Sequence, residues 1–157
     1  MPPHEIAGSN PTQERRRWMA VLARASAGEI EARLADGPEL PPHVRLRGPE
    51  TGMVMVRGRA GGSGAPFNLG EMTVTRCAVR LESGTIGHAY VAGTDVKQAE
   101  LAAVLDAALQ DGGRQAGLQQ AVIAPLAALQ AARRADEAAK AAATSVEFFT
   151  MATMRGG

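Results

Sequence analysis

Two groups of residues in the middle of the chain have the types and spacing that suit anion binding. The first group is the glycine-rich segment Arg57-Gly58-Arg59-Ala60-Gly61-Gly62-Ser63-Gly64. Glycines let backbone amides approach an anion closely and arginines add positive charge, so Arg59 with residues 61–64 can cradle a phosphate. The segment lacks the Lys-Ser/Thr ending of a P-loop, and no helix start follows it directly. A flexible loop between two strands is therefore the alternative interpretation.

Arg76 and Arg80 form the second group. Their spacing of four places both side chains on one face of a strand. Two guanidinium groups on a sheet face can bind a carboxylate or a phosphate through paired hydrogen bonds. The alternative is a solvated face, or pairing with Glu71 and Glu82. From the sequence alone we favour this alternative, because surface ion pairs are common.

Other reactive side chains give no catalytic pattern. Cys77 falls on the strand face opposite Arg76, and we interpret it as a small core residue rather than a nucleophile. No other histidine and no acidic residue neighbours His88 in the sequence, which favours a structural or exposed role for this side chain. No Ser-His-Asp signature, metal-ligand spacing or obvious carboxylate pair is present. We therefore predict no metal site and leave the catalytic residues unassigned.

The composition of the 157 residues excludes several classes of function. Lys and Arg number 17 against 16 Asp and Glu, so the net charge of +1 argues against a nucleic-acid binder. The single cysteine cannot form an internal disulfide or a four-cysteine iron–sulfur site. No apolar run approaches the roughly 18 residues of a membrane span, and no signal peptide is recognisable, so we expect a soluble cytoplasmic protein. Because only 3% of residues are aromatic, the core should be modest, and partner chains could supply further burial.

The first third of the chain predicts a helical hairpin. We expect residues 1–10 to be a disordered leader and residues 11–157 to form a single domain. Asn10-Pro11 is a typical helix start, and the first helix should run to about Arg24. Ser26 and Glu29 form a capping box that begins a second, short helix. Prolines in residues 38–50 predict an extended connector.

The middle and the end of the chain predict an antiparallel sheet followed by helices. Strands are expected at 53–56, 73–81 and 85–92, and the last two should form a hairpin around Ser83-Gly84. A helix should span 95–110. We predict a short strand or extended arm at 118–123, because Pro125 is awkward inside a helix. A further helix then runs to about Ala143.

Residues 146–151 indicate a final strand or docking arm. Phe148 and Phe149 make this segment an aromatic anchor, which either closes the chain's own sheet or docks into another subunit. The expected order α-α-β-β-β-α-α-β places the chain in the α+β class, with an N-terminal helical hairpin, a central antiparallel sheet and C-terminal helices.

Several blocks of the sequence occur in this order in one bacterial family. They are Arg15 with Trp18-Met19, Val21-Leu22-Ala23, Glu50-Thr51-Gly52, Arg59 with Gly61-Gly62-Ser63-Gly64, Phe67 with Gly70-Glu71, Thr73 with Thr75-Arg76, Ala78-Val79-Arg80-Leu81, Gly84-Thr85 with Gly87, Ile123-Ala124-Pro125-Leu126, and Phe148-Phe149-Thr150-Met151. Over residues 11–155 the sequence resembles the PhnG family, which belongs to the carbon–phosphorus lyase core complex. Cys77 and His88 depart from the family pattern, which argues against essential chemistry at either residue.

The resemblance implies a role in the use of alkylphosphonates as a source of phosphorus. In that complex the PhnG-type chain and three others, the H, I and J subunits, form a hetero-octameric core with two copies of each, and ATP-binding-cassette-type proteins join its periphery. The implied enzyme is the α-D-ribose 1-methylphosphonate 5-triphosphate synthase, a transferase in which methylphosphonate displaces adenine from the ribose C1 of ATP. ATP is then a substrate of the complex, and this chain needs no cofactor. The radical iron–sulfur chemistry belongs to the J subunit.

Three hypotheses remain open for this chain. In the first, Arg59, residues 61–64, Arg76 and Arg80 position an anionic ligand. In the second, the chain is a structural scaffold without ligand contacts, and Trp18, Phe148 and Phe149 dock partner subunits. In the third, the chain is an independent phosphate- or nucleotide-binding module, against which the absence of a recognised nucleotide motif argues. None of them involves nucleic acid or a membrane.

Overall fold

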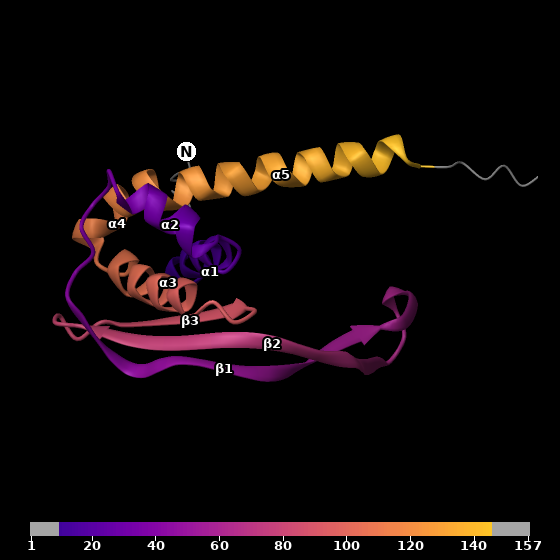
Figure 1. The fold of residues 1–157 in the computed structure, drawn as a ribbon, viewed down its shortest axis with the longest axis horizontal. Helices are drawn as coiled ribbons and strands as arrows, with labels where there is room; N and C mark the ends of the chain where they lie inside the picture. The colour runs from indigo at the N-terminus through magenta and orange to yellow at the C-terminus, as the bar shows by residue number, and fades with distance from the viewer. Residues whose placement is uncertain (1–9, 146–157) are drawn as a thin grey trace, which may run out of the picture.

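The computed structural model describes residues 10–145, and residues 1–9 and 146–157 lie outside the described residues. The expected leader, apart from its last residue Asn10, and the expected final strand with Phe148 and Phe149 therefore lie outside the described part of the chain. Within it, helices and a three-stranded antiparallel sheet form an α+β fold, as the sequence predicts (Figure 1).

The helical hairpin begins where the sequence places it. Helix α1 spans Pro11–Leu22, and the Asn10 side chain accepts a hydrogen bond from the Thr12 amide at 3.1 Å. Helix α2 spans Ala27–Leu34 and begins with the predicted capping box. There the Ser26 hydroxyl accepts from the Glu29 amide at 3.2 Å, while the Glu29 carboxylate accepts from the Ser26 amide at 2.9 Å. Both helix starts thus satisfy amides that would otherwise lack partners.

The sheet has the order β1-β2-β3, with strands β1 (His43–Arg59), β2 (Pro66–Leu81) and β3 (Ile86–Ala92). All neighbouring strands are antiparallel. The expected connector at 38–50 is wrong over its second half, because residues 43–50 belong to β1. Pro49 fits within this strand because β1 lies at the sheet edge and its register with β2 is irregular between Arg47 and Glu50.

One face of the sheet is covered by helix α3 (Val96–Leu109), and α1 and α2 lie beyond it (Figure 1). The covered face carries Thr75, Cys77 and Val79, as the predicted alternation requires. Glu100 of α3 ties β1 to this layer, because its carboxylate accepts from Arg45 at 2.8 and 2.7 Å and pairs with His43 at 3.3 Å. These contacts hold the pKa of Glu100 below its ordinary value.

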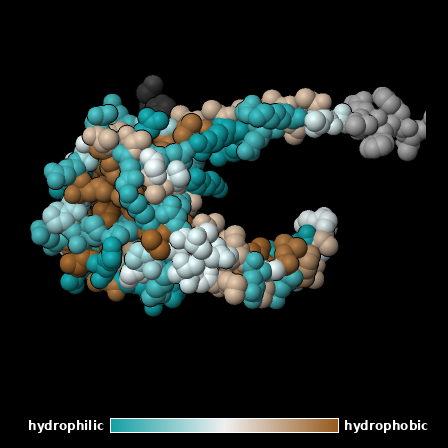
Figure 2. Space-filling model, viewed as in Figure 1, coloured by the Kyte–Doolittle hydropathy of each residue, from teal (hydrophilic) through white to brown (hydrophobic). Residues whose placement is uncertain are grey.

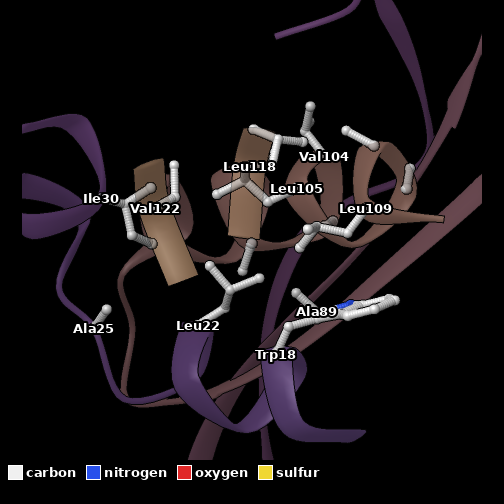
Figure 3. Close-up of a cluster of buried hydrophobic side chains, with 14 of the residues drawn as sticks. Trp18, Leu22, Ala25, Ile30, Ala89, Val104, Leu105, Leu109, Leu118 and Val122 are labelled. Atoms are coloured by element: carbon white, nitrogen blue, oxygen red, sulfur yellow. The ribbon is translucent and has the colours of Figure 1, made fainter. Parts of the chain in front are cut away.

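The hydrophobic core lies between the helices and the covered face of the sheet. Trp18 and Leu22 of α1 pack with Leu105 and Leu109 of α3 (Figure 3). Alanines supply much of the remaining buried surface of α3, so the helix and the sheet lie close together. The core is continuous but contains few large side chains, as the composition predicts.

The C-terminal helices contradict one prediction. Residues 118–123 are neither strand nor arm. Helix α4 (Gly112–Leu118), a π-helical turn (Gln119–Ile123) and helix α5 (Ala124–Ala143) follow one another without a break. Pro125 lies in the first turn of α5, where its missing amide hydrogen is least costly, and the wider π-helical turn precedes it. Leu118, Val122 and Leu126 are buried at helical spacing, and this burial outweighs the proline signal.

Two elements extend beyond the body of the molecule. Strand β3 ends at Ala92 opposite Val74, so beyond this point β1 and β2 pair only with each other among the described strands. Residues 53–72 of this two-stranded segment are here named the hairpin arm. Helix α5 is anchored by the Gln130 side chain, which donates to the Val21 carbonyl at 2.9 Å, and by an ion pair between Arg133 and Glu29. Its following residues, 134–143, are exposed and are named the α5 arm. Both arms project in the same direction, with a hollow between them (Figures 1 and 2).

Candidate functional site

Among residues 10–145, the most deeply buried charged group is the carboxylate of Asp106 on α3, which is completely shielded from solvent. It accepts four hydrogen bonds from three other residues. Arg15 donates from Nε at 3.0 Å and from Nη2 at 2.7 Å, Trp18 donates from Nε1 at 2.9 Å, and the His88 backbone amide donates at 2.9 Å. Such a carboxylate is stable in the interior only because its charge is paired and its oxygens have donors.

The Asp106 network connects α1, α3 and β3, and the hydrogen bond to Asp106 raises the pKa of Arg15. Sequence reasoning missed this residue as a candidate. The available signal was a single acidic residue within the apolar run Val104-Leu105-Asp106-Ala107-Ala108-Leu109. Because the described contacts already satisfy the carboxylate, the network is suited to holding three elements together.

The network also changes the interpretation of Trp18. This residue is only 3% exposed, and its indole N–H is already bonded to Asp106. The side chain thus lies inside the core of its own chain (Figure 3), and this burial disfavours direct contact with a partner. Docking of a partner by Trp18 stays a prediction. Phe148 and Phe149, the other predicted docking residues, lie outside the described residues.

The glycine-rich segment forms the tip of the hairpin arm. Arg59 lies opposite Pro66 at the last pair of β1 and β2, and a short 3-10 turn, η1 (Ala60–Gly62), follows it. Gly61 and Gly62 have φ values of 63° and 78°, which side chains disfavour. The alternative interpretation as a loop between strands is therefore confirmed for the backbone. Phosphate contact by Arg59, Gly61, Gly62, Ser63 and Gly64 stays a prediction.

Arg76 lies on the open face of the sheet, where none of the described helices covers β2. Its partner is Glu50 on β1, with Nε at 3.2 Å and Nη2 at 3.0 Å from one carboxylate oxygen, rather than Glu71 or Glu82. Hydrogen bonding to Tyr90, and then to Glu50, raises the pKa of Arg76. These three residues line a shallow pocket of about 200 Å³. The Glu50 carboxylate offsets the charge that Arg76 would offer to an anion.

Arg80 lies on the same open face, opposite Val44 and Ile86, and borders a different pocket of about 460 Å³. It is separated from Arg76 by about 13 Å, at about 3.3 Å per residue of strand. The tip of the arm is much further away, since ten residues of β2 from Pro66 to Arg76 correspond to about 33 Å. The structure therefore does not bring Arg59, Arg76 and Arg80 together around one phosphate group.

Cys77 and His88 occupy the positions expected of structural residues. Cys77 is buried, its thiol donates to the Arg47 carbonyl at 3.5 Å, and burial raises the pKa of the thiol. The His88 side chain is exposed on the open face. Among residues 10–145, no three His, Cys, Asp or Glu side chains are close enough to share a metal ion. No helix in this range is long and apolar enough to cross a membrane.

The hairpin arm carries the main apolar surface of the described chain. Its exposed side chains, with their exposed fractions, are Met53 (68%), Val54 (39%), Met55 (52%), Phe67 (46%), Leu69 (61%) and Met72 (42%). An apolar surface of this kind is typical of an interaction site. The sequence predicts a strand at 53–56, but it gives no sign that this strand extends beyond the third strand of the sheet.

Comparison with known proteins gives two agreeing results. The family model for the phosphonate metabolism protein PhnG matches residues 13–156. The alpha-D-ribose 1-methylphosphonate 5-triphosphate synthase subunit PhnG of Rhizobium meliloti (strain 1021) is 47% identical over 141 residues, which cover 88% of each chain. Both results confirm the resemblance seen in the sequence blocks.

Proposed function

The chain belongs to the PhnG family of phosphonate metabolism proteins, and we propose that it is a non-radical subunit of a carbon–phosphorus lyase core complex. In the proposed reaction, methylphosphonate displaces adenine from the ribose C1 of ATP and yields α-D-ribose 1-methylphosphonate 5-triphosphate. The observation that carries this proposal is the 47% identity, over 88% of both chains, to a relative named as a subunit of that synthase.

The proposed partners are the H, I and J subunits, in a core with two copies of each chain and ATP-binding-cassette-type proteins at its periphery. The exposed hairpin arm and α5 arm, together with the apolar side chains of the hairpin arm, support the proposal that the chain works within an assembly. In this proposal ATP is a substrate of the complex, the chain itself holds no cofactor, and the complex acts in the cytoplasm. The single cysteine agrees with radical iron–sulfur chemistry in another subunit.

Co-purification tests the proposed assembly. The tagged full-length chain is expressed together with the H, I and J subunits, and the complex is sized and its composition measured. We expect recovery of all four subunits in equal amounts. A solitary chain under the same conditions would contradict the proposed function.

The contribution of this chain to the reaction has two candidate forms. In one, Arg76 and Arg80, or separately Arg59 with residues 61–64, position an anionic ligand at the open face or at the arm tip. In the other, the chain is a scaffold that contacts no ligand. The wide spacing of the arginines and the pairing of Arg76 with Glu50 favour the scaffold.

The double variant Arg76→Ala/Arg80→Ala separates these two forms. If the arginines position the ligand, product formation by the assembled complex should fall about tenfold or more, because hydrogen bonds to charged groups contribute roughly 1.5–3 kcal/mol. Arg16→Ala/Arg24→Ala is the matched control, because both of these arginines are exposed on the helical layer. Full activity of the Arg76/Arg80 variant in an intact complex would contradict ligand positioning by these arginines and would favour the scaffold role.

A further inference from the structure

No element within residues 10–145 covers either face of the hairpin arm. The pairing of β1 with β2 continues to Arg59 and Pro66, whereas β3 stops at Ala92 and the helices pack on the other end of the sheet (Figure 1). A two-stranded ribbon of this kind is marginally stable in water on its own. Its apolar side chains therefore favour a covered state over the exposed one.

The strand register divides the apolar side chains of the arm between two faces. Met53 lies opposite Thr73 and Met55 opposite Glu71, so both methionines continue the helix-covered face of the sheet and point toward the hollow below α5. The register of β1 and β2 shifts between Val56 and Arg57, so this alternation does not continue unchanged to Phe67 and Leu69. The exposed Leu69 side chain lies against Gly58 of β1, so close that a Cβ atom on this glycine would clash with it.

The opposite face of the arm is also apolar. Val54 lies directly opposite Met72, and the two side chains are 39% and 42% exposed. A flat surface could cover only one face of the ribbon and would leave the other in water. Apolar side chains on both faces therefore fit a groove that surrounds the arm, and methionines adapt well to irregular walls.

The tip of the arm is positively charged. Arg57 and Arg59 lie two residues apart, and Glu71 is the only acidic residue between positions 53 and 72. Within residues 10–145, no carboxylate forms an ion pair with Arg57 or Arg59, in contrast to Arg76 with its Glu50 partner. A groove that receives this tip is complementary if it ends in carboxylates.

We propose that the hairpin arm inserts into a groove of another subunit of the complex, with apolar walls along the ribbon and carboxylates around its tip. This interaction rests on the proposed function, because the occupant is a protein of the same assembly. Residues 146–157 or a second copy of this chain are the competing occupants. A short segment lying along the ribbon covers one face of it, whereas the apolar side chains on both faces require a groove.

Substitution at the apolar face tests the insertion. Leu69→Glu should lower recovery of the four-subunit complex about tenfold or more, because a buried carboxylate without a partner is strongly disfavoured. Val96→Glu is the matched control, since Val96 is 50% exposed at the start of α3, outside the arm, and gains the same charge. The isolated Leu69→Glu chain should keep the wild-type unfolding temperature. Recovery equal to the wild type would overturn the insertion while leaving the proposed function intact.

Substitution at the tip tests the predicted carboxylates. Arg57→Glu should lower recovery of the complex, and the loss should be larger at low salt than at high salt, because screening weakens charge repulsion. Arg57→Lys keeps the charge and should restore most of the recovery. An Arg57→Glu chain that assembles like the wild type at low salt would contradict a carboxylate-lined end.

Crosslinking identifies the occupant without relying on a disruptive variant. A photoreactive phenylalanine analogue replaces Phe67 in the co-purified complex, and the same analogue at Ser83, in the turn before β3, is the control. We expect the crosslink from position 67 to reach another subunit. A crosslink to residues 146–157, or to a second copy of this chain, would overturn the proposed occupant. If the wild-type chain forms no complex at all, the proposed function fails and the insertion falls with it.

Discussion

At the scale of single residues, Asp106 decides how the N-terminal helix meets the rest of the fold. Arg15 and Trp18 lie one turn apart on α1, so both can reach the same carboxylate from one helix face. The His88 amide of the edge strand β3 donates to Oδ2 of Asp106, the oxygen that also accepts from Arg15 Nη2. One acidic side chain therefore gives a partner to a guanidinium, an indole N–H and a strand-edge amide at once.

Asp106→Ala should lower the free energy of unfolding by about 3–5 kcal/mol, because it leaves the Arg15 charge and buried donors without their partner. Urea unfolding of the isolated chain measures this change. Asp136→Ala is the control, since Asp136 is 64% exposed and pairs with Lys140 on the surface of α5. That variant should change stability by roughly 0.5 kcal/mol or less. A similar small change for Asp106→Ala would show that the network contributes little.

At the scale of elements, the close packing of α3 on the sheet determines which small residues the core needs. A Cβ atom built on Gly87 of β3 would lie 2.6 Å from the backbone nitrogen of Ala107 and 2.8 Å from its Cβ, and would clash with the Ala103 carbonyl oxygen. These contacts are with backbone and with a rigid methyl group, which cannot move aside. The alanine-rich sequence of α3 therefore serves a helix that lies unusually close to its sheet.

Gly87→Ala should destabilise the isolated chain by about 1–3 kcal/mol, toward the upper end, because the overpacked contact is with helix backbone. Thermal and urea unfolding measure the loss. Gly52→Ala is the matched control, since Gly52 lies in β1, has no positive φ, and has no atom within 4 Å of the place that a Cβ would take. A Gly87→Ala chain as stable as the control would mean that α3 can shift away from the sheet without cost.

At the scale of the whole molecule, a small core carries two long extensions. The buried residues gather near the base of α5 and the shared end of the three strands, whereas the hairpin arm and the α5 arm leave that body in the same direction (Figure 2). Residues 134–143 of α5 have no buried side chain. Such extensions contribute little to the stability of the isolated chain and are suited to contact with other subunits.

Removing residues 146–157 tests the two roles that the sequence leaves open for Phe148 and Phe149. If these residues dock into another subunit, the chain that ends at Ser145 should keep its unfolding temperature and lose recovery of the four-subunit complex. A matched chain with only residues 152–157 removed retains both phenylalanines and should assemble normally. A drop of several degrees in the unfolding temperature of the shorter chain would instead indicate that the aromatic pair closes the chain's own fold.

Local features of this fold depend on a few neighbouring residues and follow from the amino-acid sequence. The start of α1 at Asn10-Pro11, the capping box of Ser26 and Glu29, and the placement of buried Cys77 and half-buried Arg76 on opposite strand faces were all predictable. Caps and strand alternation are set by local backbone geometry, so they can be read within a short window. The family blocks likewise identified the chain before any geometry was known.

The three-dimensional fold determines which distant residues meet. It paired Arg76 with Glu50, assigned Arg15 and Trp18 to Asp106, and separated Arg59 from the other candidate arginines. It also made residues 118–123 helical against the signal of the nearby proline. These outcomes depend on strand register and on burial between elements far apart in the chain, and a local pattern carries no information about either, because both are fixed by packing of the whole fold.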